Sequence, residues 1–301
     1  MEPHIEPVDL IGMVPVAAHM DRRKGEGSMI SATKLLWEEN LRRAGYIPRP
    51  AEVAALASGA RKFLVEGLPG TGKTFLAEVY ARITSATYIY HMCHSWSSDQ
   101  EFFLGIHVPS VVRGDADNVE SPGVLAVVAR AAEVGPVVLC IDELDKAPEA
   151  VENLLLGWLQ DGEVPVCPGR SIRTNMKNVT VFITSNGMRT VSDALQRRCR
   201  RLFIEPHPQD VLGEILAGSA AAGVIKMAIK VMAEVAEKDG ATPSLQEMKN
   251  FLHEVEGASC VADVRQALAG WAARGTSGRE FALHGKPRYL DPLWGEIRKN
   301  Q

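Results

Sequence analysis

Residues 67–74 read Gly67-Leu68-Pro69-Gly70-Thr71-Gly72-Lys73-Thr74. This run has the G-x-x-x-x-G-K-[ST] spacing of a phosphate-binding loop, with one further glycine inside it. The glycines allow backbone N–H groups to turn inward around a polyphosphate, because no Cβ stands in the way. The lysine supplies a positive charge for the β- and γ-phosphates, and the Thr74 hydroxyl can ligate Mg²⁺. The run therefore predicts a nucleoside triphosphate site that uses all eight residues.

The segments on either side of this loop fit the same prediction. Residues 62–66 are mostly apolar and predict a short strand, and residues 74–83 predict a helix. The N-terminus of a helix favours anions, because its first N–H groups are unpaired and its dipole is positive there. A plain glycine-rich turn is the alternative interpretation, and the strand and helix around the loop argue against it.

Length and composition indicate a globular protein. The chain has 301 residues, 46% of them hydrophobic, which is enough for one sizeable α/β domain and a smaller one. Lys and Arg total 33 against 37 Asp and Glu, for a net charge of −4, which does not favour a surface that coats nucleic acid. The 5 cysteines are scattered, as is typical of a reducing cytosol. No apolar run approaches the length of a membrane span, so we expect a soluble cytoplasmic protein.

Apolar strands alternate with helices in the first two thirds of the chain. The strand candidates are residues 62–66, 87–91, 137–142, 179–185 and 201–205. Their near-continuous apolar character predicts an α/β fold with a five-stranded parallel sheet that helices cover on both faces. Two long polar stretches interrupt the alternation, at residues 108–123 and 162–178. Their length predicts inserted hairpins or loops with a task of their own.

Four segments are predicted along the chain. Residues 1–30 contain several prolines and glycines and predict an irregular arm. An α/β core over residues 31–206 follows. Residues 207–274 are rich in Ala, Leu and Met at helical spacing and predict a small helical domain. Residues 275–301 are set apart as a C-terminal tail.

Two carboxylates stand at the end of the third predicted strand. Asp142 is placed there to hold Mg²⁺, directly or through water, and Glu143 to orient or deprotonate the attacking water. An acidic turn after a buried strand is the alternative, and the phosphate-binding loop upstream argues against it. We interpret the next two charges, Asp145 and Lys146, as ordinary turn or interface residues.

Polar side chains also follow the fourth predicted strand and precede the fifth. The amide of Asn186 can hydrogen-bond the γ-phosphate or the lytic water, which predicts a sensor of hydrolysis. Four arginines, Arg197, Arg198, Arg200 and Arg201, precede or open the last strand. One of them can serve as an arginine finger on the γ-phosphate of an adjacent subunit. A solvated basic edge is the alternative for any one of them.

The order of these motifs resembles that of the AAA+ ATPases, and specifically their MoxR-like branch, over residues 45–270. Residues 46–50, with Ile47 among them, look like the segment that lines the adenine site. Residues 142–147 are close to the family's second nucleotide motif. The family's finger box is similar to residues 194–199, where Arg198 takes the finger position and Arg197 is the runner-up.

The chain departs from the family at one site residue. In the family an arginine of the helical lid normally touches the γ-phosphate. Residues 243–244 are the most plausible match to that position and include no arginine, so Arg265 is the best substitute. Residues 175–178 lack the guanine-binding N-K-x-D pattern, so ATP is preferred over GTP. The implied cofactors are ATP and Mg²⁺.

The resemblance also implies an assembly and an activity. The assembly is a homo-oligomeric ring, expected to be hexameric, and it hydrolyses ATP at subunit boundaries to remodel or assemble a client protein. A von Willebrand A-domain protein is a typical partner of the branch. Two alternatives stay open. One is a nucleic-acid motor of the same superfamily, and the other is a nucleotide-gated scaffold that hydrolyses negligibly.

Overall fold

The computed structural model describes residues 26–106, 120–167 and 170–301. The chain divides into two compact units between Ile204 and Glu205, with Pro69–Thr71 grouped with the second. Most of the predicted N-terminal arm lies outside the described residues. The last residues of the predicted arm, 26–30, belong to helix α1 (Glu26–Arg43) and are therefore helical instead of irregular.

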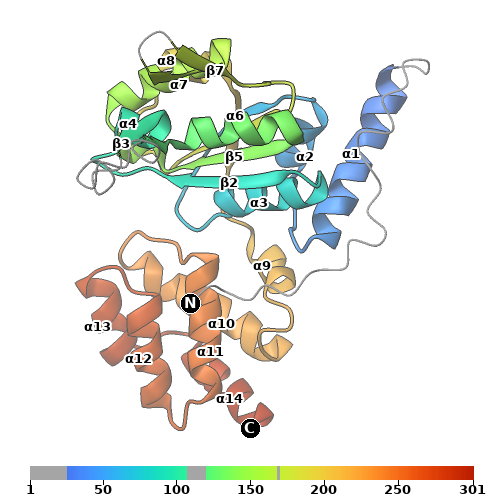
Figure 1. Ribbon diagram of the computed structural model, residues 1–301. Coiled ribbons are helices and arrows are strands. Elements are labelled where there is room, and N and C mark those ends of the chain that lie inside the picture. Colours follow the sequence, from blue (N-terminus) through green and yellow to red (C-terminus); the bar gives the residue numbers. More distant parts are fainter. Residues whose placement is uncertain (1–25, 107–119, 168–169) are drawn as a thin grey trace. The chain divides into compact units, whose positions relative to one another are not determined.

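Five parallel strands form the sheet of the first unit (Figure 1). They are β1 (Lys62–Gly67), β2 (Thr87–Met92), β5 (Val137–Asp142), β8 (Val179–Ser185) and β9 (Arg200–Ile204), in the order β2-β5-β8-β1-β9. Every neighbouring pair is parallel. The predicted parallel sheet is confirmed, and each strand lies within a residue of its predicted bounds.

Alternate side chains of these strands enter two separate hydrophobic cores. On one face Leu64, Ile141 and Ile183 pack with α6 (Val124–Val134) and α7 (Glu149–Asp161). On the other face Phe63, Cys140 and Phe182 pack with α1, α2 (Pro50–Ala57) and α3 (Lys73–Ile83). Each fully buried Leu, Ile or Phe contributes about 1.5–3 kcal/mol. Burial on both faces explains why the central strands β5 and β8 have no polar alternation.

A pair of antiparallel strands lies at each of the two predicted insertions. The first comprises β3 (Leu104–Ile106) and β4 (Glu120–Pro122), which follow the short helix α4 (Asp99–Phe102). Residues 107–119 of this insertion lie outside the described part. The second comprises β6 (Glu163–Cys167) and β7 (Arg170–Arg173), and residues 168–169 are again outside the description. Gly162 joins α7 to β6 with φ +70°, where a Cβ would lie 3.0 Å from the carbonyl oxygen of Thr174, so glycine is required there.

Six helices make up the described part of the second unit. They are α9 (Gln209–Ile215), α10 (Ala222–Glu237), α11 (Leu245–Glu256), α12 (Val261–Trp271), α13 (Thr276–His284) and α14 (Leu290–Asn300). Their shared core includes Val231, Phe251, Leu268 and Leu293. Residues 275–301, which the sequence set apart as a tail, form α13 and α14 and bury Ala282, Leu290, Leu293 and Ile297 in this same core. The helical unit therefore continues to the end of α14.

Asp239 fixes the start of α13. Its carboxylate accepts the backbone N–H groups of Arg274, Gly275 and Gly278 at 2.7–2.9 Å. These bonds, that of Gly278 first, lower the pKa of Asp239 below its usual value. At Gly278 a Cβ would lie 2.3 Å from a carboxylate oxygen of Asp239, so only glycine allows this approach.

Among the described helices, none is both long and apolar enough to cross a membrane.

Candidate active site

The glycine loop joins β1 to α3 through two left-handed residues. Gly70 has φ +75° and Gly72 has φ +94°. Gly72 is also the N-cap of α3 and provides no side-chain cap. The first N–H groups of α3 therefore have no capping side chain, which is the arrangement that binds phosphate at a helix N-terminus. This local geometry matches the predicted phosphate-binding loop.

Lys73 folds back onto this loop. Its Nζ donates to the carbonyl oxygens of Gly67 and Leu68, each at 2.8 Å, and the side chain is buried. Burial lowers the pKa of Lys73, and the nearby carboxylates, Asp142 first, oppose that shift. The ammonium group thus lies over the loop, where a bound polyphosphate would replace the two carbonyl oxygens as its partner.

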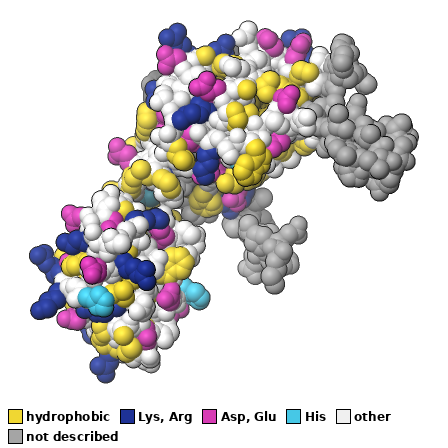
Figure 2. Space-filling model, turned by 90° about the vertical axis from the view of Figure 1, so that its left-hand side faces the viewer, with side chains coloured by type: hydrophobic (Ala, Val, Ile, Leu, Met, Phe, Trp, Pro, Cys, Tyr) yellow, Lys and Arg dark blue, Asp and Glu magenta, His cyan; other side chains and the backbone are white. Residues whose placement is uncertain are grey.

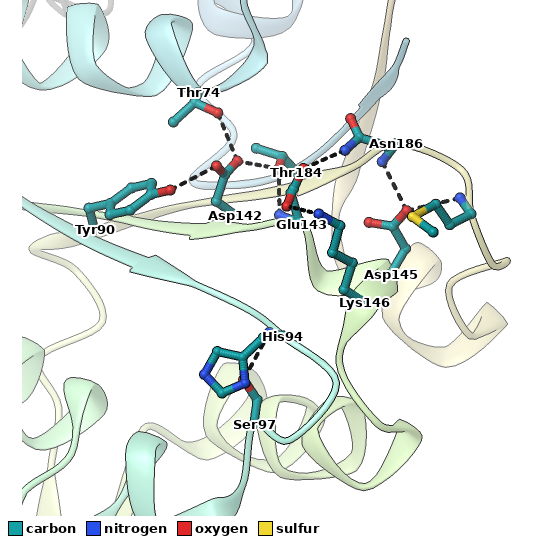
Figure 3. Close-up of polar contacts among 11 residues, drawn as sticks. Thr74, Tyr90, His94, Ser97, Asp142, Glu143, Asp145, Lys146, Thr184 and Asn186 are labelled. Carbon is teal, nitrogen blue, oxygen red and sulfur yellow. Dashed lines mark hydrogen bonds and ion pairs between the residues drawn. The ribbon is translucent and has the colours of Figure 1, made fainter. Parts of the chain in front are cut away.

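At the end of β5 the carboxylate of Asp142 accepts hydrogen bonds from three hydroxyl groups (Figure 3). Its Oδ1 accepts from Thr74 Oγ1 at 2.7 Å and from Thr184 Oγ1 at 2.5 Å. Its Oδ2 accepts from Tyr90 Oη at 3.0 Å. The structure therefore brings together Thr74 and Asp142, the two residues expected to bind the metal. A hydroxyl and a carboxylate are oxygen ligands, which fit Mg²⁺.

Glu143 adopts a left-handed backbone, with φ 56° and ψ 46°. This conformation costs a non-glycine residue about 1–2 kcal/mol, and such strain is typical of functional sites. Its N–H donates to Thr184 Oγ1 at 2.9 Å, which holds the strained turn in place. Its Oε1 accepts from Asn186 Nδ2 at 2.7 Å and its Oε2 from Lys146 Nζ at 2.5 Å. The expected base and the expected sensor are thus in direct contact.

Asp145 and Lys146 belong to the same network, which differs from their interpretation as ordinary turn or interface charges. Both lie in the 3₁₀ turn η3 (Leu144–Lys146) directly after Glu143. Asp145 is buried, and its Oδ2 accepts the N–H groups of Asn186 at 3.1 Å and Met188 at 2.9 Å. The carboxylate therefore fixes the backbone of the sensor. This role is not visible in the sequence, because Asn186 and Met188 lie more than 40 positions away from Asp145.

A second buried carboxylate, Glu152 on α7, holds the same loop further on. It pairs with the guanidinium of Arg189 and accepts the N–H of Ser192 at 2.9 Å. Arg189 also donates to the carbonyl oxygens of Ala147 at 2.8 Å and Leu144 at 3.3 Å. Sequence analysis missed Tyr90, Thr184, Glu152 and Arg189 altogether. These contacts join the segment after β8 to η3 and α7.

The segment expected to line the adenine site lies beside the loop through Tyr46. Its hydroxyl donates to Glu52 Oε1 at 2.8 Å, and the buried Glu52 also pairs with Arg49 at 2.6 Å. A Cβ on Gly72 would lie 3.7 Å from the Tyr46 ring. Burial raises the pKa of Tyr46, and Glu52 adds to the shift. Ile47, the residue expected to line the adenine site, directly follows this tyrosine and is half-buried.

The finger candidates end the short helix α8 (Asp193–Arg198). Arg197 and Arg198 are both exposed, and Arg198 donates to Gln160 Oε1 and to the Ala194 carbonyl oxygen, each at 3.0 Å. By contrast, Arg201 pairs with Glu66 at 2.9 Å and lies over the ring of Phe203 at 4.9 Å. Arg201 is exposed as well, but it is paired with a carboxylate on the edge strand β9, whereas neither arginine of α8 forms an ion pair with a described residue.

Arg265 is engaged inside the helical unit. Its guanidinium donates to the carbonyl oxygens of Ala282 at 2.7 Å, Leu283 at 3.2 Å and Gly285 at 3.1 Å. These carbonyls end α13, where a cation is favoured by the helix dipole. The expected contact of Arg265 with a γ-phosphate stays a prediction.

A match to a known protein family supports the same fold. Residues 62–199 match the family described as AAA domain (dynein-related subfamily). The matched range runs from β1 to the residue after α8, so it contains the glycine loop, Asp142, Glu143 and Asn186. A mutant of RuvB from Thermotoga maritima is a similar solved structure, with 16% identity and a TM-score of 0.45, covering 83% of this chain and 69% of that chain. No curated protein matches the chain. The first unit thus has an AAA+ P-loop fold.

Proposed function

We propose that the chain is an ATP-hydrolysing AAA+ ring ATPase of the MoxR-like branch that remodels or assembles a client protein. The observation that carries the hydrolysis is the convergence of polar groups at the ends of β5 and β8. Asp142 is bonded to Thr74 of the loop helix, and Glu143 is bonded to Asn186. A phosphate-binding loop, a metal-binding carboxylate, a base and a γ-phosphate donor are the parts that triphosphate hydrolysis needs.

Each residue takes one role in this proposal. Lys73 and the N–H groups of the loop bind the phosphates of ATP. Thr74 and Asp142 would hold Mg²⁺, which neutralises charge that develops on the phosphate oxygens. Glu143 orients and deprotonates the attacking water, and Asn186 donates to the γ-phosphate. Arg198 would complete the site of the next subunit in a hexamer.

Several features support a protein client in the cytoplasm. On the face drawn in Figure 2, acidic and basic side chains are interspersed over the described residues of each unit. Nucleic-acid motors instead gather Lys and Arg into stripes. Cys93, Cys140, Cys199 and Cys260 are free thiols, as is usual in a reducing compartment. The two hairpin insertions are the segments we propose for client contact, and a von Willebrand A-domain protein is the partner that the family resemblance suggests.

Glu143→Gln is the direct test of the proposed function. We expect this variant to bind ATP as the unchanged protein does but to lose about 10²–10⁴-fold in turnover, because general-base catalysis is removed. The matched control is Glu133→Gln, an exposed glutamate on α6 of the same unit. Glu143→Gln should also retain its client protein when ATP is present. Capture of DNA or RNA in place of a protein would contradict the remodelling activity, and equal turnover in both variants would contradict the role of Glu143.

A further inference from the structure

Both carboxylate oxygens of Glu143 are already occupied by donors of the protein. Lys146 Nζ lies 2.5 Å from Oε2, and Asn186 Nδ2 lies 2.7 Å from Oε1 (Figure 3). A water that Glu143 is to deprotonate would share these oxygens with the two donors, and donation to the charged carboxylate makes it a weaker base. Both oxygens of the proposed base thus carry a protein donor in this structure.

Asn186 takes part in the same restraint. Its side-chain amide is the donor that would reach a γ-phosphate, and here that amide nitrogen is bonded to Glu143. Its backbone N–H is held separately by Asp145 Oδ2 at 3.1 Å. Because the backbone is fixed, the amide can turn to a phosphate by side-chain rotation alone. Glu143 would then keep the contact to Lys146 as its remaining restraint.

Lys146 can break its contact at low cost. Its side chain is 37% exposed and that of Glu143 is 20% exposed. Among the described residues, Glu143 is the one carboxylate in ion-pair contact with this lysine. Exposed Lys–Glu pairs at this spacing are weak, since solvent screens them and a long side chain must be ordered. Such a pair can hold Glu143 at rest and still open in each cycle.

We propose that Lys146 is a positioning residue that holds Glu143 away from water and lowers ATP turnover until the pair opens. This inference depends on the proposed hydrolysis through Glu143. From the strength of exposed ion pairs, we expect the restraint to reduce turnover by about 2- to 5-fold.

The test compares Lys146→Met and Lys146→Gln with Lys146→Arg in the full chain. Both neutral variants should raise kcat by about 2- to 5-fold and leave the dissociation constant for ATP unchanged, because Lys146 contacts the base and not the phosphate loop. Lys146→Arg keeps a cation next to Glu143 and should retain the original kcat. The matched control is Lys299→Met, which removes a Lys299–Glu296 pair of 2.6 Å at the same i,i+3 spacing on α14 and should change neither quantity.

Three outcomes would overturn the inference in distinguishable ways. An unchanged or lower kcat in both neutral variants would overturn the restraint and leave the proposed hydrolysis intact. A changed ATP dissociation constant with unchanged kcat would assign Lys146 to nucleotide binding instead. Absence of turnover in the unchanged protein and in every variant would overturn both the restraint and the ATPase activity.

Discussion

The hydroxyl of Thr184 on β8 donates to the carboxylate of Asp142 on the neighbouring strand β5 at 2.5 Å. The same oxygen accepts the N–H of Glu143 at 2.9 Å. One fully buried side chain thus orients the proposed metal ligand and fixes the strained turn of the proposed base. Sheet register explains the position, because Ile141 pairs with Ile183 and the next residues on both strands are Asp142 and Thr184.

Thr184→Val should therefore damage both stability and hydrolysis. Valine has the same shape but leaves the Glu143 N–H without its partner, which costs about 1–3 kcal/mol of unfolding free energy. We expect a higher Mg²⁺ requirement and a lower kcat, measured by Mg²⁺ titration of ATP turnover beside urea unfolding. Thr184→Ser keeps the hydroxyl and is the control. Equal kcat in the two variants would show that this hydroxyl does not orient the site.

Tyr90→Phe tests the third hydroxyl on Asp142. The ring lies on the edge strand β2 and is 47% exposed, so removing its hydroxyl should change the free energy of unfolding by less than about 1 kcal/mol. Burial and Asp142 raise the pKa of Tyr90, so the phenol remains a donor at neutral pH. We expect weaker apparent Mg²⁺ binding with an unchanged ATP dissociation constant when Mg²⁺ is saturating.

The control for this substitution is Tyr88→Phe on the same strand, because Tyr88 packs against the hydrophobic core that contains Cys140, whereas Tyr90 is the tyrosine that donates to Asp142. Identical Mg²⁺ dependence in Tyr90→Phe and the unchanged protein would mean that Tyr90 does not support the metal ligand.

Sequence predicted those parts of the site that are contiguous along the chain. The glycine loop, the strand before it and the pair Asp142–Glu143 each carry their chemistry within a few residues, so spacing alone identified them. The boundaries of the central strands followed from apolar runs, since these strands are buried on both faces and no polar alternation interrupts Val137–Asp142 or Val179–Ser185.

Contacts between distant segments were not predictable in this way. Thr184 and Tyr90 reach Asp142 only because β8 and β2 flank β5, and sequence contains no sign of strand order. Asp145 is interpreted from the sequence as an ordinary turn or interface charge, because nothing in the sequence distinguishes a buried carboxylate that accepts backbone N–H groups from a solvated one. Similarly, the pairing of Glu152 with Arg189 joins residues 37 positions apart.

Asp239 predicts a pH dependence in the helical unit. Three N–H donors favour its charged form and lower its pKa in the folded state. A carboxylate whose pKa is lower when folded stabilises the protein above its unfolded pKa of about 3.9. That stabilisation is lost as the pH falls through the lower, folded pKa. We expect Asp239→Asn to reduce the thermal midpoint at pH 7 and to flatten its fall below pH 4.

Calorimetric scans from pH 2 to pH 7 would measure this effect, with Asp291→Asn, an exposed aspartate in the first turn of α14, as the control. A midpoint that fell with pH as steeply in Asp239→Asn as in the unchanged protein would contradict the assignment.

Arg198 predicts complementation between two inactive variants. If its guanidinium acts on the γ-phosphate in the next subunit, Arg198→Ala should lose about 10³–10⁵-fold in turnover. Glu143→Gln should be inactive for a different reason. In a mixed ring, some boundaries combine an intact Glu143 from one subunit with an intact Arg198 from its neighbour. Mixing the two proteins should therefore restore part of the turnover, measured against each variant alone.

Two neighbouring arginines, Arg201 on β9 and Arg197 on α8, provide controls for Arg198. Arg201→Ala removes an arginine that is paired with Glu66, and Arg197→Ala removes the other exposed arginine of α8. Recovery with Arg197→Ala in place of Arg198→Ala would move the finger by one residue. Inactivity of every mixture would contradict a shared site, because an arginine that acted within its own subunit could not be supplied by a partner. Full activity of Arg198→Ala alone would remove the finger from the mechanism, since its contacts to Gln160 and Ala194 would then be its whole role.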